Sequence, residues 1–240
     1  MVVLNTPESD HQAHLYTSRR RVLACATVLE EIQAYLPADV AAEVLDFGLH
    51  LRPENLKRVL QQKIDEISPY CDVVLLGYGL CSMAVVGLQA RAAFLVIPRV
   101  DDCIGIFLGS CQNYKAEVLK EPGTYYLTKG WIDVADTPFE EHKRLVEKFG
   151  VEKANRMTRL MLRNYQRLAL INTGNYEIDQ YRDYARSMAE SFNLRFEEIK
   201  GSSSYVEKMI TGPWNEDFLV VAPGEYVRYS DFMQGKRSEL

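Results

Sequence analysis

The sequence predicts an α/β protein with a doubly wound, mostly parallel sheet, built either as one sheet or as two Rossmann-like lobes. Short apolar runs alternate with helical patterns along the chain, as they do in βαβ units. The runs are rich in Val, Ile and Leu, which is typical of parallel strands buried on both faces. The alternation stops near residue 121 and resumes near residue 167, so the chain divides into two halves of similar pattern.

Four strands, each followed by a helix, are expected in the first half. The strands are expected at residues 21–27, 43–48, 72–77 and 94–98. The helices are expected at residues 28–36, 54–67, 81–91 and 104–119. Pro53 supports the start of the second helix, because the first turn of a helix accepts proline.

The second half begins at the turn sequence Glu121-Pro122-Gly123. Strands are expected at residues 124–128, 167–171, 195–199 and 217–221, and helices at residues 138–150, 151–164, 177–192 and 203–210. The predicted organisation is a polar lead-in at 1–20, a first lobe at 21–120, a second lobe at 121–224 and a polar tail at 225–240.

Composition favours a cytosolic protein with a substantial core. The 240 residues are 47% hydrophobic with a net charge of −5, and no block of Lys or Arg suggests a nucleic-acid or membrane-surface partner. No apolar run approaches the roughly 20 residues of a membrane span, and the N-terminal residues lack the pattern of a signal peptide. In the cytosol, the five cysteines are expected to be free, catalytic or metal-bound rather than paired as disulfides.

Cys25, His50, Cys81 and Cys103 each stand at or just beyond the end of a different predicted strand. The carboxyl ends of parallel strands share one edge of a sheet, where ligands bind. With the strand order 2-1-3-4, neighbouring ends are about 5 Å apart. Three thiolates and an imidazole form a soft-metal ligand set, so we expect a zinc site, with an iron–sulfur cluster as the alternative.

Residues around this constellation are candidates for chemistry. Cys81 and Cys103 are expected at helix N-termini, where the dipole lowers a thiol's pKa. Gly77 and Gly79 free the backbone beside a cofactor, and Tyr78 between them places a polar tip at the mouth of the site. Candidate catalytic residues are Tyr78, Arg99 and Asp102, with Asp101 as an alternative to Asp102.

Each candidate also has a simpler interpretation. A buried cysteine often only fills space, and Arg99 with Asp101 or Asp102 can form a loop salt bridge. If they act in the site, Arg99 and one of the aspartates would bind substrate or orient His50.

The remaining Cys and His residues are expected to be structural or solvated. Cys71 precedes the third strand at the opposite edge, and Cys111 is expected to pack within a helix. We expect His11, His14 and His142 to be solvated. The loop at residues 172–175, Asn-Thr-Gly-Asn, resembles a ligand loop but is equally a plain turn. No GxGxxG follows the first strand, and GxxxxGK[ST], GxSxG and HExxH are absent.

Three segments, LGYGLC, VIPRVDDCIGIFLGS and EPGTYYLT, resemble the family catalogued as domain of unknown function 1638, and the similarity spans residues 22–224. The resemblance implies an association with anaerobic prokaryotes and with corrinoid-dependent methyltransferase systems, without a settled activity. Two departures stand out. Many members have a glycine-rich run where this chain has Ser82 to Gly87, and some have His in place of Asp101.

The four ligand candidates predict a zinc protein, and the resemblance implies methyl transfer in corrinoid-linked one-carbon metabolism, with a corrinoid protein or methyltransferase as partner. If one ligand is labile, the metal would hold a substrate thiol as thiolate. A non-catalytic module that binds or delivers metal or corrinoid is the alternative. A metal-free thiol enzyme with Cys81 or Cys103 as nucleophile is the third hypothesis.

Overall fold

The computed structural model describes residues 15–134 and 137–233. Most of the predicted lead-in, with His11 and His14, and the last residues of the predicted tail lie outside these described residues. Helices and strands alternate through the described chain and form two mostly parallel sheets, which confirms the predicted α/β class.

The first sheet has five strands in the order β2-β1-β3-β4-β8. Its strands are β1 (Arg20–Cys25), β2 (Ala41–Leu45), β3 (Val73–Gly77), β4 (Phe94–Pro98) and β8 (Phe218–Val221). The first four are parallel, with Cys25 opposite Leu45 and Ala24 opposite Gly77. The predicted order 2-1-3-4 is therefore confirmed. β8 lies in the range expected for the second lobe, but it pairs antiparallel with β4 and completes the first sheet.

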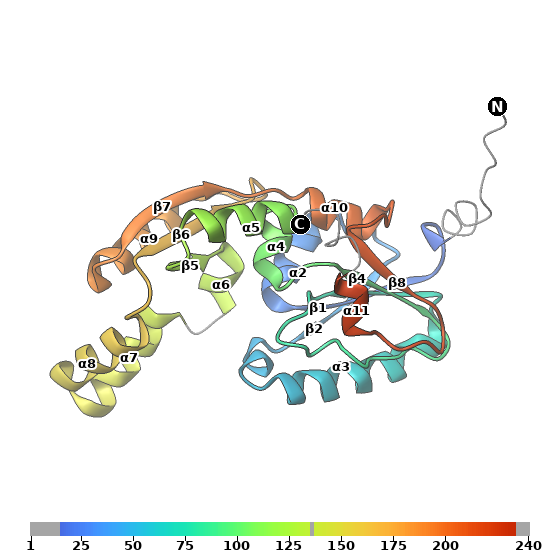
Figure 1. The fold of residues 1–240 in the computed structure, drawn as a ribbon, viewed down its shortest axis with the longest axis horizontal. Coiled ribbons are helices and arrows are strands. Elements are labelled where there is room, and N and C mark those ends of the chain that lie inside the picture. The colour runs from blue at the N-terminus through green and yellow to red at the C-terminus, as the bar shows by residue number, and fades with distance from the viewer. Residues whose placement is uncertain (1–14, 135–136, 234–240) are drawn as a thin grey trace.

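Helices cover both faces of this sheet (Figure 1). The segments after the first two strands are α2 (Ala26–Ile32) with η1 (Gln33–Tyr35), and then η2 (Phe47–Leu51), α3 (Pro53–Ile67) and η3 (Ser68–Tyr70). Further along the chain are α4 (Cys103–Phe107), α5 (Cys111–Lys120), α10 (Ser204–Thr211) and α11 (Tyr229–Met233). Pro53 occupies the first turn of α3, as predicted. The buried stripe of α3 has helical spacing and consists of Leu56, Leu60, Ile64 and Ile67.

The second sheet contains three parallel strands, β5 (Thr124–Leu127), β6 (Arg167–Asn172) and β7 (Arg195–Lys200), in that order. α9 (Asp179–Phe192) packs its buried side against β6 and β7. The connection from β5 to β6 contains α6 (Lys129–Val134), α7 (Pro138–Phe149) and α8 (Val151–Met161). α7 and α8 form a helical hairpin that projects from one end of the molecule (Figure 1).

The helix predicted at residues 81–91 is wrong. Cys81, Ser82 and Met83 have φ angles of 45°, 54° and 72°, so the chain makes a left-handed turn. The Cys81 N–H donates to the Asp101 carbonyl at 3.0 Å, and the Leu80 N–H donates to Val100 at 2.8 Å. These bonds to the loop after β4 fix a conformation that the local apolar pattern cannot reveal.

The helix predicted at residues 104–119 is also interrupted. α4 ends at Phe107, and Gly109 takes a positive φ of 80° before α5 begins at Cys111. The Ser110 side chain caps α5 by accepting the Asn113 N–H at 2.9 Å, as serine does at many helix starts.

The two sheets face each other through their carboxyl edges. At Gly130, just after β5, a Cβ atom would lie 2.9 Å from Thr27 of α2, so only glycine permits this close packing. Lys129 Nζ lies 2.6 Å from Glu30 Oε2. The buried Glu31 Oε2 accepts hydrogen bonds from Thr173 Oγ1 at 2.8 Å and from Asn175 Nδ2 at 2.6 Å. The loop at residues 172–175, which resembles a ligand loop in sequence, therefore joins the two lobes.

A buried arginine organises the base of the second sheet. Arg167 is fully buried, and its guanidinium contacts Glu117 at 2.9 Å, Glu197 at 3.0 Å and the Thr124 hydroxyl at 2.8 Å. The neighbouring arginines, Arg195 first and then Arg167, hold the pKa of Glu197 down to about 2. Because burial of an unpaired charge is costly, the cluster ties α5 to β6 and β7.

Replacing Arg167 with Met should lower the free energy of unfolding by about 2 to 3 kcal/mol, measured by urea denaturation. Breaking a fully buried ion pair costs roughly 3–5 kcal/mol. The loss expected here is smaller because Glu117 and Glu197 keep some solvent contact. Arg195→Met is the control. Its side chain is 54% exposed, so its loss should cost less than about 1 kcal/mol. Equal effects of the two substitutions would contradict the assignment.

The left-handed turn at residues 81–83 leads to a second prediction about stability. Met83 is 45% exposed, and its positive φ strains any side chain that has a Cβ atom. Met83→Gly relieves this strain but also gives the unfolded chain more conformational entropy. The net effect should be a rise in the free energy of unfolding of about 0.5 to 1 kcal/mol. Met83→Ala keeps the Cβ atom and should give no gain. If alanine stabilises as much as glycine, backbone strain is not the cause.

Candidate functional site

All four predicted metal ligands lie at the carboxyl edge of the first sheet. Cys25 is the last residue of β1 and precedes α2, and Cys81 stands in the left-handed turn after β3. Cys103 is the first residue of α4, after β4, and His50 lies in η2, after β2. The parallel register of these strands explains why residues far apart in sequence meet at this edge.

The structure brings Cys25, Cys81 and Cys103 into one buried neighbourhood. Their exposed fractions are 1%, 9% and 8%. Burial raises the pKa of Cys81 and of Cys103, and the nearby Cys25 raises both further. The thiols therefore lie within electrostatic range of one another. The expectation that a helix start lowers the pKa of Cys81 and of Cys103 is wrong. Cys81 stands in a turn that offers no helix dipole, and Cys103 does start α4, but burial raises its pKa all the same.

His50 lies beside this neighbourhood as a half-buried, stacked imidazole. Its Nδ1 is 3.1 Å from the Phe47 carbonyl oxygen. A carbonyl only accepts hydrogen bonds, so this contact assigns the proton to Nδ1 and leaves the lone pair of Nε2 for another partner. Burial lowers the pKa of His50, which favours the neutral ring. The ring stacks on Phe47 at 5.3 Å and on Tyr78 at 5.8 Å between centroids.

Tyr78 links His50 to the thiols. It is 1% exposed rather than at the mouth of a pocket, where the sequence suggests it. Burial raises its pKa, and Cys25, Cys81 and Cys103 raise it further, so all three thiols lie near the ring. Among the residues that the structure describes, its hydroxyl has no hydrogen-bond partner. Because a buried hydroxyl without a partner costs about 1–3 kcal/mol, this atom marks a position where a bound group would be stabilising.

Gly77 and Gly79 serve close packing around Tyr78. A Cβ atom at Gly77 would lie 2.6 Å from the Ala24 Cβ, and one at Gly79 would lie 2.7 Å from the Val100 carbonyl oxygen. The two glycines therefore let β3 approach β1 and let the next loop cross above it. A cofactor contact of either glycine stays a prediction.

Asp102 adjoins the thiols and holds the start of α4. Its carboxylate caps α4 by accepting the Ile104 N–H at 2.9 Å, and it accepts the Tyr114 hydroxyl at 3.0 Å. Burial raises the pKa of Asp102, and the charge of Asp102 contributes to the raised pKa of Cys81 and Cys103. The Nδ1 atom of His50 contacts the Phe47 carbonyl, and a role of Asp101 or Asp102 in orienting His50 stays a prediction.

Arg99 lies toward β8. One guanidinium nitrogen donates to the Phe218 carbonyl oxygen at 3.4 Å. Burial raises the pKa of Tyr205. Arg99 partly offsets this rise through a backbone hydrogen bond to Tyr205 and through its positive charge. These contacts tie the end of β4 to β8 and α10. A catalytic role of Arg99 stays a prediction, as does that of Asp101.

The second lobe contributes an aromatic residue that the sequence does not indicate as part of the site. Trp131 of α6 meets the Phe47 ring edge-on, with centroids 5.6 Å apart. Trp131, Phe47, His50 and Tyr78 therefore form a chain of ring contacts from the second lobe toward the thiols. Thr27 also belongs to the site, since its hydroxyl lies 3.1 Å from Cys25 Sγ. Contacts between lobes depend on the tertiary fold, and no local motif signals them.

Three other Cys and His residues lie away from this cluster. Cys71 donates to the Ile67 carbonyl at 3.4 Å and is buried before β3, as expected for a structural thiol. Cys111 starts α5, after the break in the helix, and is half-buried. His142 is bonded rather than solvated, because its Nδ1 lies 2.9 Å from the Thr158 hydroxyl.

A metal site is not preformed in the described part of the chain. Within residues 15–134 and 137–233, no group of three or more His, Cys, Asp or Glu side chains is close enough together to hold a metal ion. Coordination by the three thiols would require their side chains to draw together. Across the same residues, no helix is both long enough and apolar enough to span a bilayer.

Comparison with known proteins identifies a family without an assigned activity. No curated protein and no solved structure matches the chain. One family model, described as a protein of unknown function (DUF1638), matches residues 44–210. The matched region is more than half of the chain and contains His50, Cys81 and Cys103. The chain therefore belongs to the family catalogued as domain of unknown function 1638.

Proposed function

We propose that this protein binds a soft metal ion, zinc by preference, through Cys25, Cys81 and Cys103 with His50 as the fourth ligand. The observation that supports this most strongly is the gathering of three thiols from three strand ends in one buried neighbourhood. Thiolate and imidazole groups are the usual ligands of zinc in proteins. The ion would neutralise thiolates that the buried site otherwise disfavours.

The surroundings of His50 and Tyr78 fit this proposal. Histidines that bind metal usually donate their other ring N–H to a carbonyl or carboxylate, and His50 has such a contact with Phe47. The unpartnered Tyr78 hydroxyl offers a hydrogen bond to a metal-bound sulfur or to a substrate atom. The cysteine side chains would have to draw together to complete the site, and the left-handed turn gives Cys81 an exposed flank at Ser82 and Met83.

Methyl transfer is the reaction we propose for the site. If one protein ligand is exchangeable, the ion can hold a small thiol substrate as its thiolate. That sulfur would attack the methyl group of a methylated corrinoid. The new bond is S–CH3, the cobalt–carbon bond breaks, and its electron pair stays on cobalt as Co(I). The thiol proton leaves to solvent when the thiolate binds.

The proposal includes a cytosolic location and a corrinoid protein or methyltransferase as partner. Free thiols suit a reducing compartment. A non-catalytic protein that binds or delivers metal or corrinoid would use the same ligands without turnover.

A metal-free thiol enzyme receives less support. Reactive cysteines have a lowered pKa near cations or helix starts. Burial instead raises the pKa of Cys81 and of Cys103, and the neighbouring thiols and Asp102 raise it further.

Metal content tests the binding proposal. Protein purified without oxygen should contain about one zinc per chain, measured by inductively coupled plasma mass spectrometry. Cys25→Ser, Cys81→Ser and Cys103→Ser should each reduce the content to well below half of this. Cys71→Ser removes a buried thiol from the opposite edge and should leave it unchanged. Iron together with acid-labile sulfide would identify the metal centre as an iron–sulfur cluster instead of a zinc site. Wild-type protein without metal would overturn the proposal.

Cobalt spectroscopy tests the transfer step. Metal-loaded protein mixed with methylcobalamin and 2-mercaptoethanol should convert the methylcobalt spectrum to that of Co(I), with the methylated thiol as product. Cys81→Ser should slow this conversion at least about tenfold, and Cys71→Ser should not. Binding of the corrinoid without any conversion would exclude methyl transfer to this thiol and favour the delivery function.

A further inference from the structure

The α7–α8 hairpin is an addition to the second sheet that the sheet itself does not require. β5 and β6 are adjacent parallel strands, and one crossover helix is enough to connect such a pair. α6 already lies in this connection, and α7 and α8 add a helical hairpin after it. Gly150 joins the two helices with a positive φ of 79°, and a Cβ atom there would have no neighbour within 4 Å among the described residues.

One side of the hairpin is well anchored. Leu145, Ala154 and Leu162 are buried. The Phe139 ring meets Tyr184 and Phe192 of α9 edge-on, at 5.7 Å and 6.3 Å between centroids. The hairpin is therefore held as a rigid projection rather than a loose insertion.

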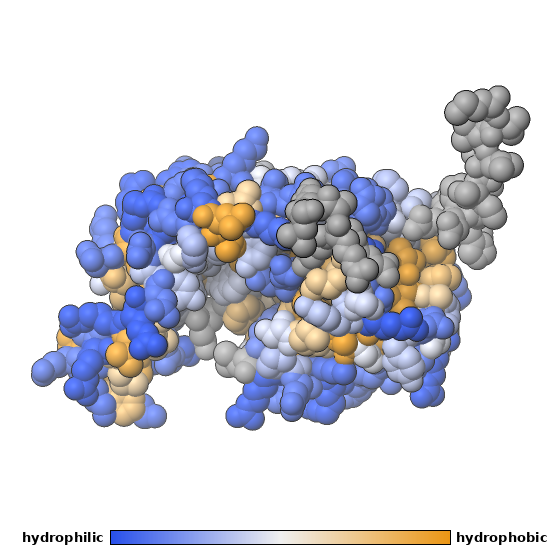
Figure 2. All heavy atoms as spheres, viewed as in Figure 1, coloured by the Kyte–Doolittle hydropathy of each residue, from blue (hydrophilic) through white to orange (hydrophobic). Residues whose placement is uncertain are grey.

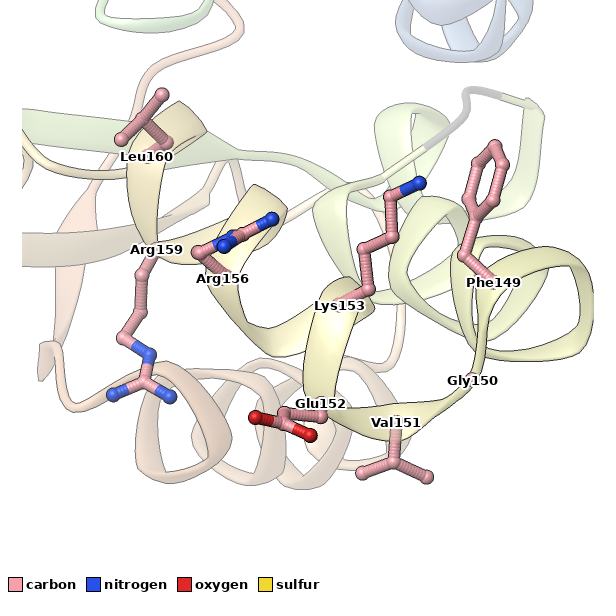
Figure 3. A pocket seen from close by; sticks show the side chains of 8 residues that line it. All are labelled: Phe149, Gly150, Val151, Glu152, Lys153, Arg156, Arg159 and Leu160. Atoms are coloured by element: carbon pink, nitrogen blue, oxygen red, sulfur yellow. The ribbon is translucent and has the colours of Figure 1, made fainter.

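The other side exposes large apolar side chains. The exposed fractions are 39% for Phe149, 60% for Val151, 66% for Leu160 and 51% for Met161. Figure 2 shows apolar surface on this projection among hydrophilic residues. Exposed apolar residues that cluster in this way mark interaction sites. Three of the four line a surface groove that extends from Phe149 to Leu160 (Figure 3).

The groove carries a net positive charge, although the protein is acidic. Three basic side chains, Lys153, Arg156 and Arg159, and one acidic side chain, Glu152, line it, whereas the whole chain has a net charge of −5. Lys153 reaches over the Phe149 ring at 4.5 Å from its centroid (Figure 3). Arg156 and Arg159 line the same groove and are exposed. The surface thus combines apolar anchors with positive charge.

We propose that this groove, lined by residues 149–160, is a docking site for an acidic, amphipathic helix of a partner protein. Apolar side chains of the partner helix would lie against Phe149, Val151 and Leu160, and its carboxylates would face Lys153, Arg156 and Arg159. A second copy of the hairpin fits less well, because it would bring one basic surface against another, and like charges oppose association.

Fluorescence anisotropy with a synthetic probe tests the site on the full-length protein. The probe is a labelled amphipathic helix of about five turns with Leu on one face and Glu elsewhere. It should bind, and added salt should weaken the binding because exposed charges are screened. The same peptide with Lys in place of Glu should bind at least about tenfold more weakly.

Matched variants locate the binding surface. Arg156→Glu and Leu160→Asp should each weaken binding of the acidic probe about tenfold or more. Arg58→Glu reverses an exposed arginine on α3, and Leu119→Asp alters an 82% exposed leucine on α5. Both should leave binding unchanged. Circular dichroism confirms that each variant folds.

Three results would overturn the docking proposal. The first is absence of binding by the acidic probe. The second is equal weakening by the hairpin variants and their controls. The third is a dimer in sedimentation equilibrium that Leu160→Asp dissociates, which would identify a second copy as the occupant.

Discussion

Parallel pairing of β1 with β3 and of β3 with β4 is the constraint on which the candidate site depends. It brings the ends of three strands to one edge and thereby gathers Cys25, Cys81 and Cys103. Gly77 permits the close approach of β3 to β1, since any side chain there would collide with Ala24. The thiols are therefore positioned by backbone pairing before any ligand binds.

The second lobe closes this edge. α6 packs on α2 through Gly130, and the buried Glu31 joins α2 to the loop after β6. Trp131 then contacts Phe47, the residue that stacks on His50. The thiols and Tyr78 are buried at this same edge. The same burial makes a free thiolate unfavourable and makes a neutralising ligand favourable.

Much of the fold was accessible from the sequence, because alternation of apolar runs and the parallel-strand composition reflect burial directly. The strand order 2-1-3-4 and the positions of Cys25 and Cys103 at the sheet edge followed from that reasoning. The turn at Cys81 did not, because bonds to Val100 and Asp101 impose it from another segment. The return of β8 to the first sheet was hidden for a similar reason, since its apolar run is compatible with either sheet.

The site itself was only partly predictable. Strand ends indicate which residues meet, but they do not reveal that His50 would bond to Phe47, that Tyr78 would be buried, or that Trp131 would join from the second lobe. These features depend on how the lobes pack and on side-chain rotamers. The same limit applied to Asp102, whose carboxylate caps α4 and accepts the Tyr114 hydroxyl.

X-ray absorption at the zinc edge, on protein purified without oxygen, tests whether the three cysteines bind the ion. Three sulfur neighbours at about 2.3 Å and one nitrogen at about 2.0 Å are expected. A first coordination sphere made only of oxygen and nitrogen would show that Cys25, Cys81 and Cys103 do not bind the ion.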